Sequence, residues 1–110
     1  MAEQGDGIFV SHVDATDWEH DEETGGLVHM LRAEDGIQAG LWKPGPVAGT
    51  PIEVELEADE TFLVLDGTGE LRVDGGEALE LRAGVLVSLR KGARTRWIVD
   101  EAFREFWVYS

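Results

Sequence analysis

One glutamate stands where a carboxyl group could do acid–base chemistry. Glu60 opens a stretch in which residues 62–65 are all apolar. If its side chain points inward with those of Phe62 and Val64, towards Trp97 across an apolar cavity, loss of water raises the pKa of the carboxyl group. A carboxyl group with a pKa near neutrality can both donate and accept a proton. The alternative is a glutamate at a strand edge, hydrogen-bonded or solvated, that takes part in no reaction.

Three further glutamates, Glu53, Glu55 and Glu57, alternate with apolar residues at positions 52, 54 and 56. If these glutamates pointed inward with Glu60, they would form a carboxylate cluster for a hard cation such as Mn²⁺ or Mg²⁺. Alternation along a strand places only one of the two sets inside, and the apolar set is the better fit to a core. We therefore expect the three glutamates to face solvent.

Aromatic residues could line a ligand pocket. The chain has four tryptophans, and Trp42 and Trp97 lie in expected strands. At the mouth of a barrel they would form a flat apolar floor for a ring or acyl group, with indole N–H groups as donors. Packing in the core is the alternative for each tryptophan. The pocket predicted from the sequence consists of Trp42, Val54, Leu56, Phe62, Thr95 and Trp97.

The three histidines, His12, His20 and His29, all lie in the first third of the chain. A transition-metal site needs three or four well-placed nitrogen, sulfur or oxygen ligands. The chain has no cysteine, and no second histidine is near His20. Histidines satisfied within the structure are the expectation, although His29 could still reach the pocket from an N-terminal strand.

Short stretches of alternating apolar and polar residues, separated by turns, predict β-strands along most of the chain. Turn signals include Asp66-Gly67 and Lys91-Gly92, in which glycine accepts a positive φ angle. About ten short strands with such spacing are typical of a sandwich or barrel. Residues 14–23 hold six acidic residues and predict an exposed loop or one short helical turn. The expected strands are Ile8–Val10, Leu27–Arg32, Ile37–Trp42, Ile52–Leu56, Thr61–Leu65, Glu70–Val73, Ala78–Leu81, Val85–Leu89, Thr95–Val99 and Arg104–Tyr109.

Composition excludes several classes of protein. With 110 residues the chain is expected to form one domain. Its net charge of −14 disfavours binding to nucleic acids or to anionic membranes. No apolar run approaches the roughly 20 residues of a membrane-spanning helix. Residues 1–6 lack the features of a secretory signal, so we expect a cytoplasmic protein.

From Gly40 onward the order of motifs resembles that of a cupin. Glu60 is followed after six residues by Gly67, as at the end of the first cupin motif. Gly84 is followed by Gly92, as in the turn of the second motif. With Trp42 and Trp97, this spacing is similar to that of small cupins grouped with the (S)-ureidoglycine aminohydrolase cupin domain and the ethanolamine-utilisation cupin. The resemblance implies an all-β jelly-roll barrel of two antiparallel sheets, with residues 1–35 as N-terminal strands and acidic loop and 40–110 as the cupin core.

The chain departs from the resemblance at the metal ligands. The early histidine positions of metal-binding cupins correspond to Val54 and Leu56, or to Glu53 and Glu55, and the late one to Thr95. We therefore expect no bound metal or other cofactor. The leading hypothesis is a metal-independent cupin that binds a small molecule. The alternatives are an isomerase, lyase or cyclase that uses Glu60 as general acid or base, and an enzyme related to ureidoglycine aminohydrolase.

A homodimer is expected, because the resemblance implies that small cupins pair through sheets or N-terminal strands. On the last strand, Trp107 and Tyr109 alternate with Phe106 and Val108. One pair could belong to the core and the other to an interface between two copies.

Overall fold

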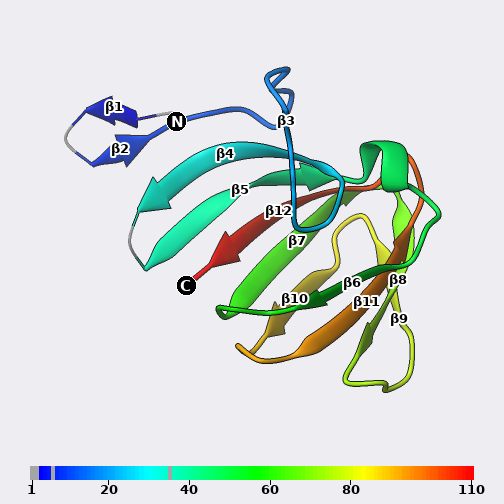
Figure 1. Cartoon of the computed structure of the whole chain (residues 1–110). Coiled ribbons are helices and arrows are strands. Elements are labelled where there is room, and N and C mark those ends of the chain that lie inside the picture. The colour runs from blue at the N-terminus through cyan, green and yellow to red at the C-terminus, as the bar shows by residue number, and fades with distance from the viewer. Residues whose placement is uncertain (1–2, 6, 35) are drawn as a thin grey trace.

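The computed structural model describes residues 3–5, 7–34 and 36–110, and these form mainly short antiparallel strands (Figure 1). A 3₁₀ turn, η1 (Gly45–Val47), lies in the Pro44-Gly45-Pro46 segment. The strands are β1 (Glu3–Gly5), β2 (Ile8–Phe9), β3 (Glu19–His20), β4 (Leu27–Glu34), β5 (Ile37–Lys43), β6 (Ile52–Glu55), β7 (Glu60–Asp66), β8 (Thr68–Val73), β9 (Leu79–Arg82), β10 (Leu86–Leu89), β11 (Arg94–Val99) and β12 (Arg104–Tyr109).

Two antiparallel sheets face each other, which confirms the predicted fold class. The larger has the order β10-β7-β12-β5-β4-β3, and the smaller has the order β6-β11-β8-β9. Strands β1 and β2 form a separate hairpin that projects beyond the ends of β4 and β5 (Figure 1). Among the described residues, no helix has the length and apolar character required to cross a bilayer.

The core lies between the sheets and follows the alternation of the strands. On β7, Phe62 and Val64 are each 1% exposed and point inward. They meet inward residues of the smaller sheet, such as Leu71 on β8 and Trp97 on β11. The sequence predicted a central strand at 61–65 that is buried on both faces. β7 is central, but Leu63 on its outer face is only half-buried.

Gly67 shows how the sequence sets the turn between β7 and β8. Its φ angle is +78°, which an L-residue rarely adopts. A Cβ atom at this position would also collide with the backbone of Phe103. Only glycine therefore lets the chain turn here while Phe103, which is fully buried, packs behind it.

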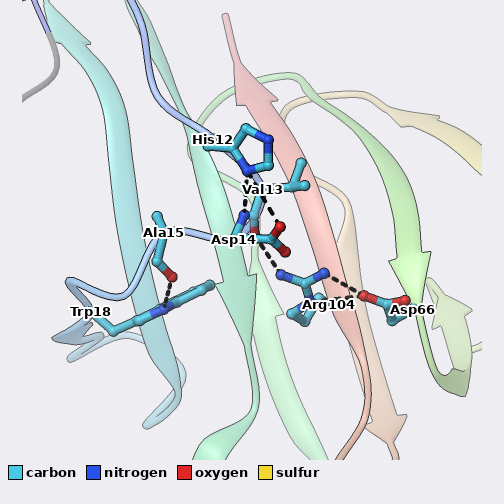
Figure 2. Close-up of polar contacts among 7 residues, drawn as sticks. All are labelled: His12, Val13, Asp14, Ala15, Trp18, Asp66 and Arg104. Carbon is cyan, nitrogen blue, oxygen red and sulfur yellow. Dashed lines mark hydrogen bonds and ion pairs between the residues drawn. The ribbon is translucent and has the colours of Figure 1, made fainter.

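The segment before β3 lies across the outer face of the larger sheet. The Arg104 guanidinium group on β12 binds the Asp66 carboxylate and donates to the carbonyl oxygen of Val13 (Figure 2). Below the same segment, His29 is 7% exposed and bonds the Ser11 hydroxyl group at 2.6 Å. These contacts hold the N-terminal segment against the sheet.

Most of the expected strands are present with bounds shifted by one or two residues. The sequence missed β1 and β3, and β3 lies inside the acidic segment predicted as a loop or helical turn. This two-residue strand pairs with Leu27 and Val28 at the edge of the sheet, and its side chains are exposed. Because neither residue of β3 contributes to the core, no apolar alternation marks it in the sequence.

Candidate ligand-binding cavity

A cavity of about 590 Å³ lies between the two sheets. One wall comes from β4, β5, β7 and β12 of the larger sheet, and the other from β6 and β11 of the smaller one. The apolar lining includes Val28, Met30, Trp42, Ile52, Val54, Leu56, Trp97 and Trp107. Its volume and mostly apolar walls are those of a site for a small organic molecule.

Glu60 lies in this cavity at the start of β7. Alternation places its side chain on the inner face with Phe62 and Val64, and it is 4% exposed. Burial, with a smaller contribution from the charge of Glu23, raises the pKa of the Glu60 carboxyl group to about 7. At neutral pH this group is therefore balanced between its protonated and ionised forms.

Glu105 on β12 is the second carboxyl group inside the cavity. Its neighbours across the ladder are Val64 on β7 and Trp42 on β5. The side chain is 5% exposed, and within the described chain its Oε2 atom is buried with no hydrogen-bond partner. Burial, followed by repulsion from Glu60, raises the pKa of Glu105 well above its ordinary value. A buried oxygen without a partner is costly and calls for a donor.

Tyr109 completes the polar part of the inner face. It lies directly opposite Glu60 in the pairing of β12 with β7. Its ring packs against Trp107 with centroids 4.8 Å apart. Burial and then the charge of Glu60 raise the pKa of the phenol, so Tyr109 stays neutral at physiological pH and can donate a hydrogen bond.

Further acidic residues line the cavity beside Trp42. The Asp21 carboxylate accepts a 2.6 Å bond from the Thr24 hydroxyl group, which in turn accepts the indole N–H of Trp42 at 2.9 Å. Partial burial and then the charge of Asp21 raise the pKa of Glu23. Glu57 lies beside them in the lining. This chain of bonds fixes the indole of Trp42 and holds Asp21 in the cavity lining.

The structure brings most of the sequence-predicted site residues together. Glu60 lines the cavity, as do Trp42, Val54, Leu56 and Trp97. The sequence predicted that the indole N–H groups of Trp42 and Trp97 would serve as donors to a ligand. In the structure both donate to threonine hydroxyl groups, so they are not free. Both indoles line the cavity.

Phe62 and Thr95 are outside the residues that line the cavity. Phe62 is 1% exposed and packs behind Trp97, with ring centroids 5.1 Å apart. The Thr95 hydroxyl group donates to the Val54 carbonyl oxygen at 2.7 Å and accepts from the Trp97 indole at 2.9 Å. These two residues position Trp97 instead of contacting the cavity, because their side chains are already engaged.

The remaining candidates lie elsewhere. His29 is on the outer face of β4, opposite to Val28 and Met30, and bonds the Asp17 carbonyl oxygen at 2.9 Å. It therefore does not reach into the cavity. His12 and His20 are exposed.

Comparison with known proteins places this arrangement in a family. Residues 31–107 match the EutQ-like cupin domain. The chain belongs to this family. No curated protein matches the chain.

Solved structures of other cupins share the fold. The EutQ protein of Clostridium difficile is 22% identical with a TM-score of 0.65, and the match covers 81% of this chain and 65% of that one. An RmlC-like cupin from Shewanella frigidimarina NCIMB 400 is 18% identical with a TM-score of 0.73, over 91% of this chain and 87% of that one. The Cnp3 cupin domain of Schizosaccharomyces pombe is 16% identical with a TM-score of 0.73, over 90% and 71%. This EutQ-like cupin thus spans about two thirds of the Clostridium EutQ chain.

The residues of this EutQ-like cupin do not fit a cupin metal centre. Glu53 and Glu55 face outward and are 79% and 64% exposed, near Arg96 at 4.0 Å and Arg94 at 3.2 Å. Val54 offers no ligand atom, and the Thr95 hydroxyl group is engaged with the backbone. Within the described ranges, no group of three or more histidine, cysteine, aspartate or glutamate residues could hold a metal ion.

Sequence reasoning missed Glu105 and Glu23 as parts of the site, and it assigned Tyr109 no role there. On β12, Glu105 precedes Phe106, Trp107, Val108 and Tyr109, so both faces of the strand are apolar and alternation does not reveal which face is inside. The signal available was a single carboxylate directly before four large apolar or aromatic residues. Glu23 carried no such signal, because its place at the cavity depends on the path of the loop between β3 and β4.

Proposed function

We propose that this EutQ-like cupin binds a small organic molecule in the cavity between its sheets, without a metal ion. The observation that carries the proposal is the Glu105 side chain, which lines a 590 Å³ cavity and whose buried Oε2 atom has no hydrogen-bond partner among the described residues. Three tryptophans line the same space and supply apolar area for a ligand body. A ligand with a polar group would satisfy Glu105 and fill the cavity.

The test is a screen of small fragments by NMR on ¹⁵N-labelled protein, with the indole resonances of the tryptophans as reporters. We expect ligands that shift the Trp42 and Trp97 indole signals. Val54→Phe fills the cavity and should weaken binding. Leu79→Phe is the matched control, because Leu79 on β9 is 46% exposed and outside the cavity lining. Fragments that shift neither indole, or that bind both variants equally, would contradict the proposal.

General acid–base catalysis is the second candidate, supported by the pKa of Glu60 near 7 and by Tyr109 opposite it. In such an isomerase, lyase or cyclase, Glu60 would move a proton while the neutral Tyr109 phenol donates to an oxygen of the substrate. Ligands from the screen would be incubated with the protein in D₂O. We expect exchange of a carbon-bound proton that Glu60→Gln abolishes. If no ligand exchanges faster than in buffer alone, the chain binds and does not catalyse proton transfer.

We further propose that two copies pair through the outer face of the larger sheet at β10 and β7, beside the part that the N-terminal segment covers. Leu86, Leu63 and Phe106 lie side by side across β10, β7 and β12. Leu86 is 73% exposed, which is unusual for a leucine in an apolar row. Light scattering should give twice the chain mass of 12.1 kDa. Leu86→Glu should shift the mass towards the monomer and Leu79→Glu should not. A wild-type monomer at micromolar concentration would refute the pairing.

A further inference from the structure

The cavity carries an excess of negative groups. Lys91 is the one lysine or arginine among the described residues that line it. The carboxyl groups in the lining belong to Asp21, Glu23, Glu34, Glu57, Glu60 and Glu105. An anionic ligand would be repelled by this set, and a cation would be attracted from solution.

Glu105 restricts the kind of ligand more than the negative charge of the cavity lining does. Its side chain is 95% buried (5% exposed), and Oε2 accepts no hydrogen bond from any described residue. An ionised oxygen in this position requires an N–H or O–H donor from the ligand. A quaternary ammonium group has no N–H and would leave the oxygen unsatisfied. A protonated amine supplies both the charge and the donor.

We propose that the ligand is a primary or secondary ammonium compound with an apolar body, whose ammonium group binds Glu105 and Glu60 while its body lies against the tryptophans. This inference rests on the proposed function and names its ligand class. Trp42 and Trp97 have their N–H groups engaged elsewhere, so their ring faces are what the ligand meets. Ring faces favour both apolar groups and cations.

Binding of such an amine is coupled to proton release. Burial raises the pKa of Glu60 to about 7, so in the free protein near pH 7 this group is partly protonated, and burial also raises the pKa of Glu105 well above its ordinary value. An ammonium group favours their ionised forms, and bound amine therefore expels protons. The other ionisable groups that face this space are Tyr109, which stays neutral, Lys91, and the carboxyl groups of Asp21, Glu23, Glu34 and Glu57. Affinity should rise as the pH increases from 6 to 8.

The experiment uses four probes of one shape: 3-phenylpropylamine, 3-phenylpropanol, 3-phenylpropanoate and trimethyl(3-phenylpropyl)ammonium. Calorimetry at pH 7 in buffers of different ionisation enthalpy gives both affinity and proton release. We expect the primary amine to bind at least about tenfold more tightly than the alcohol and the quaternary ion, the strength of one charged hydrogen bond. The carboxylate should not bind. Net proton release should accompany binding of the amine and not binding of the alcohol.

Two variants locate the ammonium group. Glu105→Gln and Glu60→Gln should each weaken amine binding about tenfold or more and leave alcohol binding unchanged or stronger. Glu53→Gln, on the outer face of β6, is the control and should change neither. Thermal melts confirm that each variant is folded.

The outcomes separate the inference from the proposed function. Alcohol or carboxylate bound in the cavity as tightly as the amine overturns the amine assignment and leaves a small-molecule site. Equal binding of the primary and quaternary ions overturns the hydrogen bond to Glu105. Amine binding that survives in both glutamine variants overturns the inference as well. If none of the four probes and none of the wider fragment set shifts an indole signal, both the inference and the proposed function fail.

Discussion

The buried carboxyl group of Glu60 should make the protein less stable as the pH rises. Its pKa is about 7 in the folded protein against 4.5 for the free side chain. Between these values the unfolded chain binds fewer protons than the folded protein, so the free energy of unfolding falls with increasing pH. A difference of about 2.5 pKa units corresponds to about 3 kcal/mol of unfolding free energy. The protein loses this amount as the pH rises from 4.5 to above 7. Below pH 4.5 both states are protonated and the penalty is absent.

Glu60→Gln should remove this penalty, because the amide keeps the shape without the charge. Relative to wild type, the variant should gain about 3 kcal/mol in unfolding free energy at pH 8 and almost nothing at pH 4.5. The repulsion that Glu60 exerts on Glu105 disappears as well, which acts in the same direction. The assay is urea unfolding at pH 4.5, 6, 7 and 8, followed by tryptophan fluorescence.

The control for this series is Glu53→Gln, since Glu53 is 79% exposed and lies near Arg96. It should follow the wild-type pH dependence. The reasoning is refuted if wild type and Glu60→Gln lose stability in parallel between pH 4.5 and 8, because Glu60 would then have an ordinary pKa and a solvated carboxylate.

Three further predictions concern the residues around the site. Trp97→Ala should cost about 3–5 kcal/mol in urea unfolding, because the indole is 7% exposed and packs on Phe62; a loss below 1 kcal/mol would mean that the ring is peripheral. Gly67→Ala should destabilise by at least about 1 kcal/mol through its positive φ angle and the collision with Phe103, and an unchanged melting temperature would contradict the turn. Arg104→Met should raise hydrogen exchange of the N-terminal segment while the amides of β7 stay protected, since Arg104 bonds the Val13 carbonyl oxygen; uniform loss of protection would show a global role instead.

The sheets were predictable because alternation and turn glycines carry most of the information. Every one of the ten expected strands overlaps a strand of the structure. Glu60 was placed inside as one of two alternatives, from its parity with Phe62 and Val64, and the structure has it inside at 4% exposed. The sequence could not show which of the inward-facing residues line the cavity and which are covered by another side chain. Phe62 shares the inner face with Glu60, yet Trp97 covers it.

Trp97 shows that one side chain can belong to both the core and the cavity lining. The sequence treated the indole as either core or cavity lining, and it is both: buried among Phe62 and its neighbours on one side and facing the cavity on the other. Glu105 was missed for a related reason. Which face of β12 is inside depends on its pairing between β7 and β5, two contacts distant in sequence. The local alternation of apolar and polar residues shows neither the double role of Trp97 nor which face of β12 is inside.

The most direct test of the account is the titration of the glutamate carboxyl groups by ¹³C NMR, with assignments from Glu60→Gln and Glu105→Gln, in the absence and presence of 3-phenylpropylamine. In the free protein we expect Glu60 to titrate near pH 7 and Glu105 well above its ordinary range. Saturating amine should lower both values. Two carboxyl groups that titrate near 4.5 and do not respond to the amine would contradict both the buried pair and the ligand assigned to it.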